Sequence, residues 1–260
     1  MQQIKDNNNR YHTMQIRYFI PNLMTIFAVC AGVTAIRLAF EGRFEKAVLF
    51  ILIAALMDGL DGRIARMLDG SSPFGAQMDS LADAVNFGVA PALVIYSYVL
   101  NKIPHLGWIA ALIYCIACCL RLARFNIMLE DKNMADWKKN YFVGVPAPAG
   151  ALLILLPLYL GALGMPIDKV TAAYFSIYTV IIAFLLVSTL PVWNGKKINH
   201  NIFKRIAIPL FLFLVAYVGL LMAYIWETLA VTAIFYIIFL PISSLAYYKN
   251  VKKYGNGSEN

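Results

Sequence analysis

Charged side chains are scarce in this sequence. Only 14% of its 260 residues are Asp, Glu, Lys or Arg, whereas about a quarter of a soluble globular domain is charged. Hydrophobic residues make up 61% of the same chain. This composition argues against a soluble globular protein and is typical of a membrane protein with several spans.

Histidine and cysteine are also rare. The three histidines, His12, His105 and His200, are too scattered to pair with a serine or cysteine nucleophile, so no covalent catalytic dyad is predicted. Cys115 and Cys118 have the spacing of a metal-binding pair, but no second pair or nearby histidine completes a site. We therefore predict that the cysteines are buried packing residues.

The N-terminal segment lacks the apolar core of a cleavable signal peptide. Residues 1–19 are expected to form a polar tail or a short helix on the membrane surface, and the first apolar span should remain as an anchor. The formal net charge of +8 comes from few charged residues. It is better explained by anionic lipid headgroups and cytoplasmic loops than by nucleic acid, which is not expected as a partner.

Eight apolar stretches are long enough to cross a lipid bilayer, since a helix needs about 20 residues to span the hydrocarbon core. They are residues 20–40, 47–67, 75–99, 107–127, 148–164, 170–192, 206–224 and 229–247. No soluble domain and no internal repeat is apparent. The sequence therefore predicts an all-α polytopic membrane protein with about eight transmembrane helices.

Basic residues predict how these spans are oriented. With the N-terminus in the cytoplasm and eight crossings, 17 lysines and arginines fall on the cytoplasmic side and 4 on the outer side. This asymmetry follows the positive-inside rule. Both termini are therefore expected in the cytoplasm.

One stretch of the chain is densely charged. Residues 58–83, DGLDGRIARMLDGSSPFGAQMDSLAD, contain five aspartates and two arginines. Asp58 and Asp61 are three residues apart, and Asp79 and Asp83 are four apart, so each pair shares one face of a helix. Two adjacent antiparallel spans would bring Asp58 level with Asp83, and Asp61 level with Asp79, in the inner half of the membrane.

Four unpaired carboxylates within a membrane would repel one another strongly. A cluster of oxygen ligands suits one or two hard divalent cations, magnesium or manganese, with water and a substrate phosphate completing the coordination. Small residues keep the helix surface low beside the cluster, and Arg66 could bind a phosphate through its guanidinium group. An alternative is that the aspartates form ordinary buried salt bridges and the glycines serve helix packing.

The spacing of these residues resembles the signature of the CDP-alcohol phosphotransferase family, D-x-x-D-G-x-x-A-R, eight residues, G-x-x-x-D-x-x-x-D. Every fixed position is matched between Asp58 and Asp83. The resemblance implies a core of six membrane helices, usually dimeric, which would be residues 20–192. Two additional spans would then occupy residues 193–250, before a polar tail at 251–260.

The resemblance also implies roles for the matching residues. Two divalent cations would be held by Asp58, Asp61, Asp79 and Asp83. Asp83 would also be the catalytic general base. The CDP group would lie against residues of the signature and of the first span, namely Asn22, Thr25, Gly62, Ala65, Arg66 and Gly75.

Three further stretches are similar to one bacterial branch of the family, the integral-membrane phosphatidylserine synthases: DSLADAVNFGVAP at 79–91, LRLARFN at 120–126 and FVGVPAP at 142–148. The similarity implies transfer of a phosphatidyl group from CDP-diacylglycerol to L-serine, giving CMP, by direct attack. The expected location is a bacterial inner membrane, with the site facing the cytoplasm. Candidates for binding serine or phosphate are Arg121, Arg124 and Asn126, although the two arginines could instead be positive-inside loop charge.

Two other functions stay open. The same chemistry could use another acceptor, such as glycerol 3-phosphate, inositol phosphate or choline. A phosphorylated acceptor would need a denser basic pocket than the sequence suggests. The second alternative is a metal-ion transporter with carboxylates in the membrane, although Arg66 beside a cation path would repel the ion.

Overall fold

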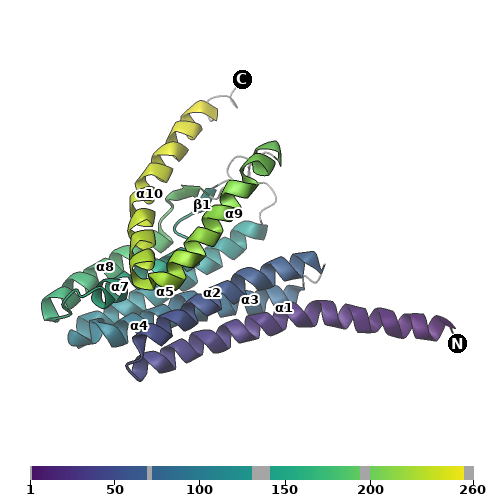
Figure 1. Ribbon diagram of the computed structural model, residues 1–260, viewed down its shortest axis with the longest axis horizontal. Coiled ribbons are helices and arrows are strands. Elements are labelled where there is room, and N and C mark those ends of the chain that lie inside the picture. The colour runs from purple at the N-terminus through teal and green to yellow at the C-terminus, as the bar shows by residue number, and fades with distance from the viewer. Residues whose placement is uncertain (1, 69–71, 131–140, 194–199, 255–260) are drawn as a thin grey trace.

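The computed structural model describes residues 2–68, 72–130, 141–193 and 200–254, and most of them are helical (Figure 1). The helices are α1 (Gln2–Phe40), α2 (Phe44–Met67), α3 (Pro73–Asp83), the π-helix η1 (Ala84–Val89), α4 (Ala90–Tyr98), the 3-10 helix η2 (Leu100–Lys102), α5 (Pro104–Glu130), α6 (Ala147–Ile154), α7 (Leu156–Ala162), α8 (Lys169–Val187), α9 (His200–Ala223) and α10 (Ile225–Tyr254). The two short strands are β1 (Tyr141–Val143) and β2 (Pro191–Trp193).

Seven of the eight predicted spans coincide with one helix or with consecutive helices, which confirms the all-α polytopic class. The sixth, predicted over residues 170–192, is helical only to Val187, and its last two residues belong to β2. Five helical segments of the described residues are long and apolar enough to cross a membrane: Phe19–Phe40, Pro73–Tyr98, Pro104–Met128, Lys169–Val187 and Ile225–Ser244. Two shorter apolar segments are Ala147–Ala162 and Ile208–Ala223. The remaining one is α2, whose C-terminal half carries two aspartates and two arginines.

The first two helices form a tight antiparallel pair (Figure 1). Small residues recur along one buried face of α1, namely Ala28, Ala31, Ala35 and Ala39. Small side chains let two membrane helices approach closely. The helix α1 therefore packs closely against α2, α3 and α4.

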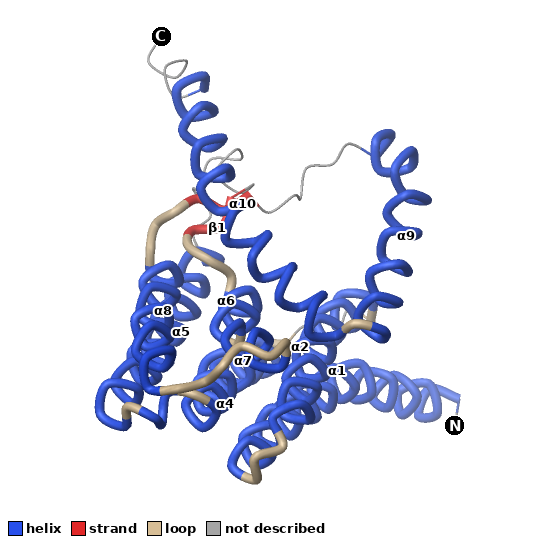
Figure 2. Tube along the Cα trace, turned by 60° about the vertical axis from the view of Figure 1, so that its left-hand side comes forward, coloured by secondary structure: helices blue, strands red, loops and turns tan. Residues whose placement is uncertain are grey.

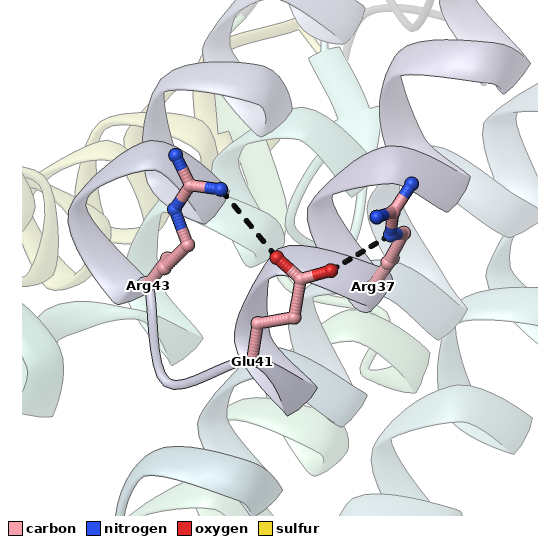
Figure 3. A network of polar contacts seen from close by, with 3 residues as sticks. All are labelled: Arg37, Glu41 and Arg43. Atoms are coloured by element: carbon pink, nitrogen blue, oxygen red, sulfur yellow. Dashed lines mark hydrogen bonds and ion pairs between the residues drawn. The ribbon is translucent and has the colours of Figure 1, made fainter.

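The turn between α1 and α2 is closed by a small ionic network (Figure 3). The Nε atom of Arg37 donates to Glu41 at 2.8 Å, and Arg43 lies 3.5 Å from the other oxygen of the same carboxylate. The hydrogen bond from Arg37 lowers the pKa of Glu41, so this carboxylate is ionised at neutral pH. Asp58 lies on α2 about 21 Å from Phe44, the first residue of that helix, and therefore toward the opposite end of the bundle.

Local breaks in the spans are the main departure from the predicted helices. The third span changes from α-helix to π-helix directly after Asp83. The fifth span is divided at Leu155, because Pro157 cannot donate a backbone hydrogen bond in the next turn. The antiparallel pairing of β1 with β2, with Tyr141 opposite Trp193, was not predicted from the apolar pattern.

Both ends of the described chain are helical. Instead of a separate segment over residues 1–19, α1 begins at Gln2 and continues without interruption, and its first turns extend beyond the bundle (Figure 1). At the other end α10 continues to Tyr254, and residues 255–260 lie outside the described ranges. Figure 2 shows α9 standing apart from the bundle along most of its length, and its side chains from Ile208 to Leu220 are almost all exposed.

Candidate active site

Three aspartates from two spans converge in the structure. One carboxylate oxygen from each of Asp58 on α2 and Asp79 and Asp83 on α3 lies within 4.8 Å of the other two. The helix α3 packs against α1, and η1, which continues it, contacts α2. This arrangement brings the three side chains, called here the carboxylate cluster, into one small volume.

The carboxylate cluster has the properties of a site for a divalent cation. The Oδ1 atoms of Asp58 and Asp83 are buried, and no hydrogen-bond partner for them is found among the described residues. An unpaired buried carboxylate is costly, and buried polar atoms in folded proteins nearly always have a partner. Several close oxygen ligands, two of them without a hydrogen-bond partner, fit a hard divalent cation.

Asp61 is placed differently from the other three aspartates. Only 3% of this residue is exposed, and its Oδ2 accepts a hydrogen bond of 2.7 Å from the hydroxyl of Thr25 on α1. It is close enough to Asp58 to interact with it electrostatically. The sequence predicted metal binding by all four aspartates, whereas the structure groups three of them and joins Asp61 to α1 by a hydrogen bond. Its role as a metal ligand stays a prediction.

A cavity of about 160 Å³ opens next to the carboxylate cluster, between α1, α2 and α3. Its lining residues are Pro21, Asn22, Thr25, Asp61, Gly62, Ala65, Arg66, Ser72, Gly75, Ala76 and Asp79. All six residues predicted to contact the CDP group are in this set. Asp79 belongs to both the cavity and the carboxylate cluster, so the two are continuous.

The first turn of α3 has features that suit the binding of an anion. Ser72 is its N-cap, and its hydroxyl accepts a hydrogen bond of 3.0 Å from the backbone N–H of Gly75. A Cβ atom on Gly75 would lie 2.9 Å from Oδ1 of Asn22, so glycine permits the close approach of α1. The first turn of a helix offers backbone N–H groups to an anion. Ser72 was not among the predicted site residues, although Ser-Pro before an apolar run is a recognisable helix start.

The two arginines of α5 have different surroundings. Arg124 donates to the backbone carbonyls of Val187 at 2.7 Å and Ser188 at 3.3 Å, and therefore holds the C-terminal end of α8. Arg121 is 8% exposed, donates through Nε to the carbonyl of Val145 at 2.9 Å, and is close enough to Asp83 to interact with it electrostatically. Only Arg121 of this pair is thus associated with the carboxylate cluster.

Asn126, the third candidate for acceptor binding, is held within the fold. Its side-chain amide donates to the hydroxyl of Ser80 on α3 at 2.9 Å. This contact links α5 to the helix that carries Asp79 and Asp83. A role in binding an acceptor stays a prediction for Asn126, as it does for both arginines.

Comparison with known proteins assigns the chain to a family. Residues 18–188 match the family model for CDP-alcohol phosphatidyltransferases. The chain belongs to this family. The match covers the segment from the end of the polar N-terminal turns to the C-terminal end of α8, so α9 and α10 lie outside the family segment.

Several curated relatives carry the same name, CDP-diacylglycerol–serine O-phosphatidyltransferase. A Helicobacter pylori relative is 35% identical over 198 residues, which are 76% of this chain and 81% of the relative. A Mycobacterium leprae relative is 49% identical over 147 residues, 55% of this chain and 49% of the relative. A Bacillus subtilis relative is 39% identical over 139 residues, 53% of this chain and 75% of the relative. The chain spans about half the length of the mycobacterial relatives that it matches.

Proposed function

We propose that this protein transfers the phosphatidyl group of CDP-diacylglycerol to the hydroxyl of L-serine, giving phosphatidylserine and CMP. The observation that carries the proposal is the continuity of the cavity with the carboxylate cluster through Asp79. A diphosphate bound in the cavity would present its phosphorus atoms to that cluster. The shared name of the relatives supports serine as the acceptor.

The residues of the cavity would bind and orient the CDP group. Gly62, Ala65 and Gly75 leave room for the nucleotide, and Arg66 and the first turn of α3 offer donors to its phosphates. The serine hydroxyl would attack the phosphorus that carries the diacylglycerol. As the new P–O bond forms, the bond to CMP breaks, and the hydroxyl proton passes to the carboxylate of Asp83.

Divalent cations fit the donor set of this site. Asp58, Asp79 and Asp83, with Asp61 beside them, would hold magnesium or manganese, because these ions prefer oxygen ligands. Bound there, the cations would offset the charge of the diphosphate and of the departing CMP.

The surroundings of the cluster favour serine over a phosphorylated acceptor. Arg121 supplies one positive charge near Asp83, enough for the single carboxylate of serine. Arg124, the other arginine of α5, is held by the carbonyls at the end of α8. Membership of a phosphatidyltransferase family argues against the metal-ion transporter.

We also propose that the protein is a homodimer of a bacterial inner membrane, with both termini and the site on the cytoplasmic side. The excess of lysine and arginine on that side of the predicted topology supports the orientation. Cytoplasmic exposure would let CMP leave into water while the lipid product stays in the bilayer.

The decisive experiment measures CMP release by the purified full chain in mixed micelles of CDP-diacylglycerol with magnesium. Serine, glycerol 3-phosphate, inositol phosphate and choline are supplied one at a time. We expect serine to raise the rate at least about a hundredfold above the rate without acceptor, with one phosphatidylserine formed per CMP. Dependence on another acceptor would replace serine in the proposal, and cation flux without CMP release would overturn it.

A methyl group placed in the cavity is expected to weaken binding of the nucleotide lipid. In Gly62→Ala the new Cβ would meet only the guanidinium of Arg66, at 3.7 Å, so the protein should fold normally. The methyl would occupy space needed by the CDP group. Overpacking of this kind costs about 1–3 kcal/mol, so we expect the KM for CDP-diacylglycerol to rise about tenfold.

Gly59→Ala is the matched control for this substitution. Gly59 lies on the same helix, one turn earlier, and is exposed. A Cβ atom there would meet nothing within 4 Å, and Gly59 is outside the residues that line the cavity. Both variants gain the helix propensity of alanine, so equal KM values in the two would contradict the assignment of the cavity to CDP.

A further inference from the structure

Four residues in the described part of the chain carry buried side-chain polar atoms without a hydrogen-bond partner. They are Asp58, Asp83, Asn86 and Tyr236. The first three lie on α2 and on the third span, at the carboxylate cluster or one turn beyond it. Tyr236 is the exception, because it comes from α10, outside the family segment. Buried hydroxyls normally have a partner, so the position of this one needs an explanation.

The helix α10 directs Tyr236 into the protein. Its buried residues Leu229, Ala233 and Leu240 recur at the spacing of one helix face. Tyr236 lies three residues after Ala233 and four before Leu240, and so belongs to the same face. The helix α10 packs against α7, β2, α9 and α6, and Figure 2 shows it crossing the bundle beside α6 and α7.

Tyr236 and Asp83 are connected through Arg121. Tyr236 and Arg121 are close enough to interact electrostatically, and so are Arg121 and Asp83. The guanidinium of Arg121 is held in place by the carbonyl of Val145 and by the ring of Phe125, whose centroid is 5.4 Å away. One fixed cation is thus within electrostatic range of both a carboxylate and an unpaired hydroxyl.

We propose that Tyr236 is a binding and specificity residue for the acceptor, and that its hydroxyl donates a hydrogen bond to the acceptor carboxylate beside Arg121. This inference rests on the proposed function and adds a side chain from outside the family segment to the same site. One fixed cation and one neutral donor match a carboxylate with a single negative charge. They match a phosphate monoester poorly, since its second charge would be left without a partner.

Tyr236→Phe tests the inference in the full chain, because it removes the hydroxyl and keeps the ring. The KM for serine should rise at least about tenfold, as expected for a lost hydrogen bond to a charged group. The KM for CDP-diacylglycerol and the kcat at saturating serine should stay within about twofold of wild type. The melting temperature should not fall, because the hydroxyl lost from the ligand-free protein has no partner among the described residues.

Tyr217→Phe is the matched control. Its hydroxyl lies 3.1 Å from Oγ1 of Thr232, in the contact between α9 and α10 and away from the carboxylate cluster. We expect this variant to keep the wild-type KM for serine and to lose a little thermal stability.

Two results would overturn the inference, and they are distinguishable. If wild type depends on serine and Tyr236→Phe keeps the wild-type KM, Tyr236 does not bind the acceptor, whether or not the melting temperature falls. If wild type releases CMP without depending on serine, the proposed function fails in the wild-type assay itself, and the inference fails with it.

Discussion

Replacing Asp83 by asparagine is expected to lower serine-dependent CMP release by about a thousandfold, within the range that a general base contributes. The amide has the shape of the carboxylate and cannot take the proton of the attacking hydroxyl. Asp83 is the member of the carboxylate cluster that lies near Arg121, and its Oδ1 has no hydrogen-bond partner among the described residues. The measurement is the initial rate at saturating CDP-diacylglycerol and serine, with magnesium present.

The fold should tolerate this substitution. Asparagine removes one negative charge from the close group of Asp58, Asp79 and Asp83, so the melting temperature without divalent cations should stay or rise. Asp168→Asn is the matched control, because Asp168 caps α8 through a 2.7 Å hydrogen bond from the N–H of Thr171, and asparagine is an equally good cap. A rate for Asp83→Asn within tenfold of wild type would remove Asp83 from the role of general base.

Removal of divalent cations is expected to abolish CMP release and to lower the melting temperature. Without a cation, the carboxylates of the cluster face one another with unpaired buried oxygens. A cation present at about a hundred times its dissociation constant would stabilise the folded protein by about 2.7 kcal/mol. The loss of CMP release is measured after treatment with a chelator, and its recovery is measured after magnesium or manganese is added.

The change in melting temperature reports cation binding separately from catalysis. A thermal melt of wild type should shift upward with added magnesium or manganese, whereas the double variant Asp58→Asn, Asp79→Asn should show almost no shift. Wild type in a chelator and the double variant should both remain folded, because neither loses an apolar contact. Full activity in excess chelator, or an equal cation-induced shift in the double variant, would contradict a metal site at this cluster.

Much of the fold follows from local patterns in the sequence. The apolar runs predicted the helical segments and the all-α class, since a helix of about 20 residues spans a bilayer and satisfies its own backbone hydrogen bonds. The spacing of Asp58, Asp79 and Asp83 predicted that their carboxylates converge, because helical periodicity decides which residues share a face. The signature also predicted membership of the family, which the match over residues 18–188 confirms.

Other features depend on contacts between distant segments, which local patterns do not contain. Arg121 and Arg124 are three residues apart in one motif, yet one lies near Asp83 and the other holds the end of α8. Tyr236 resembles an ordinary aromatic residue of an apolar span until the packing of α10 is known. The π-helix after Asp83 likewise adds no recognisable signal to the hydropathy of the third span.

The isolation of α9 has a practical consequence for handling the protein. From Ile208 to Leu220 this helix is almost entirely exposed and mostly apolar, and it meets the bundle mainly near its junction with α10. Acyl chains of an annulus must therefore solvate nearly its whole circumference. A short-chain surfactant that solvates the rest of the bundle well will solvate α9 poorly, so nanodiscs are the preferable medium for keeping α9 and α10 native.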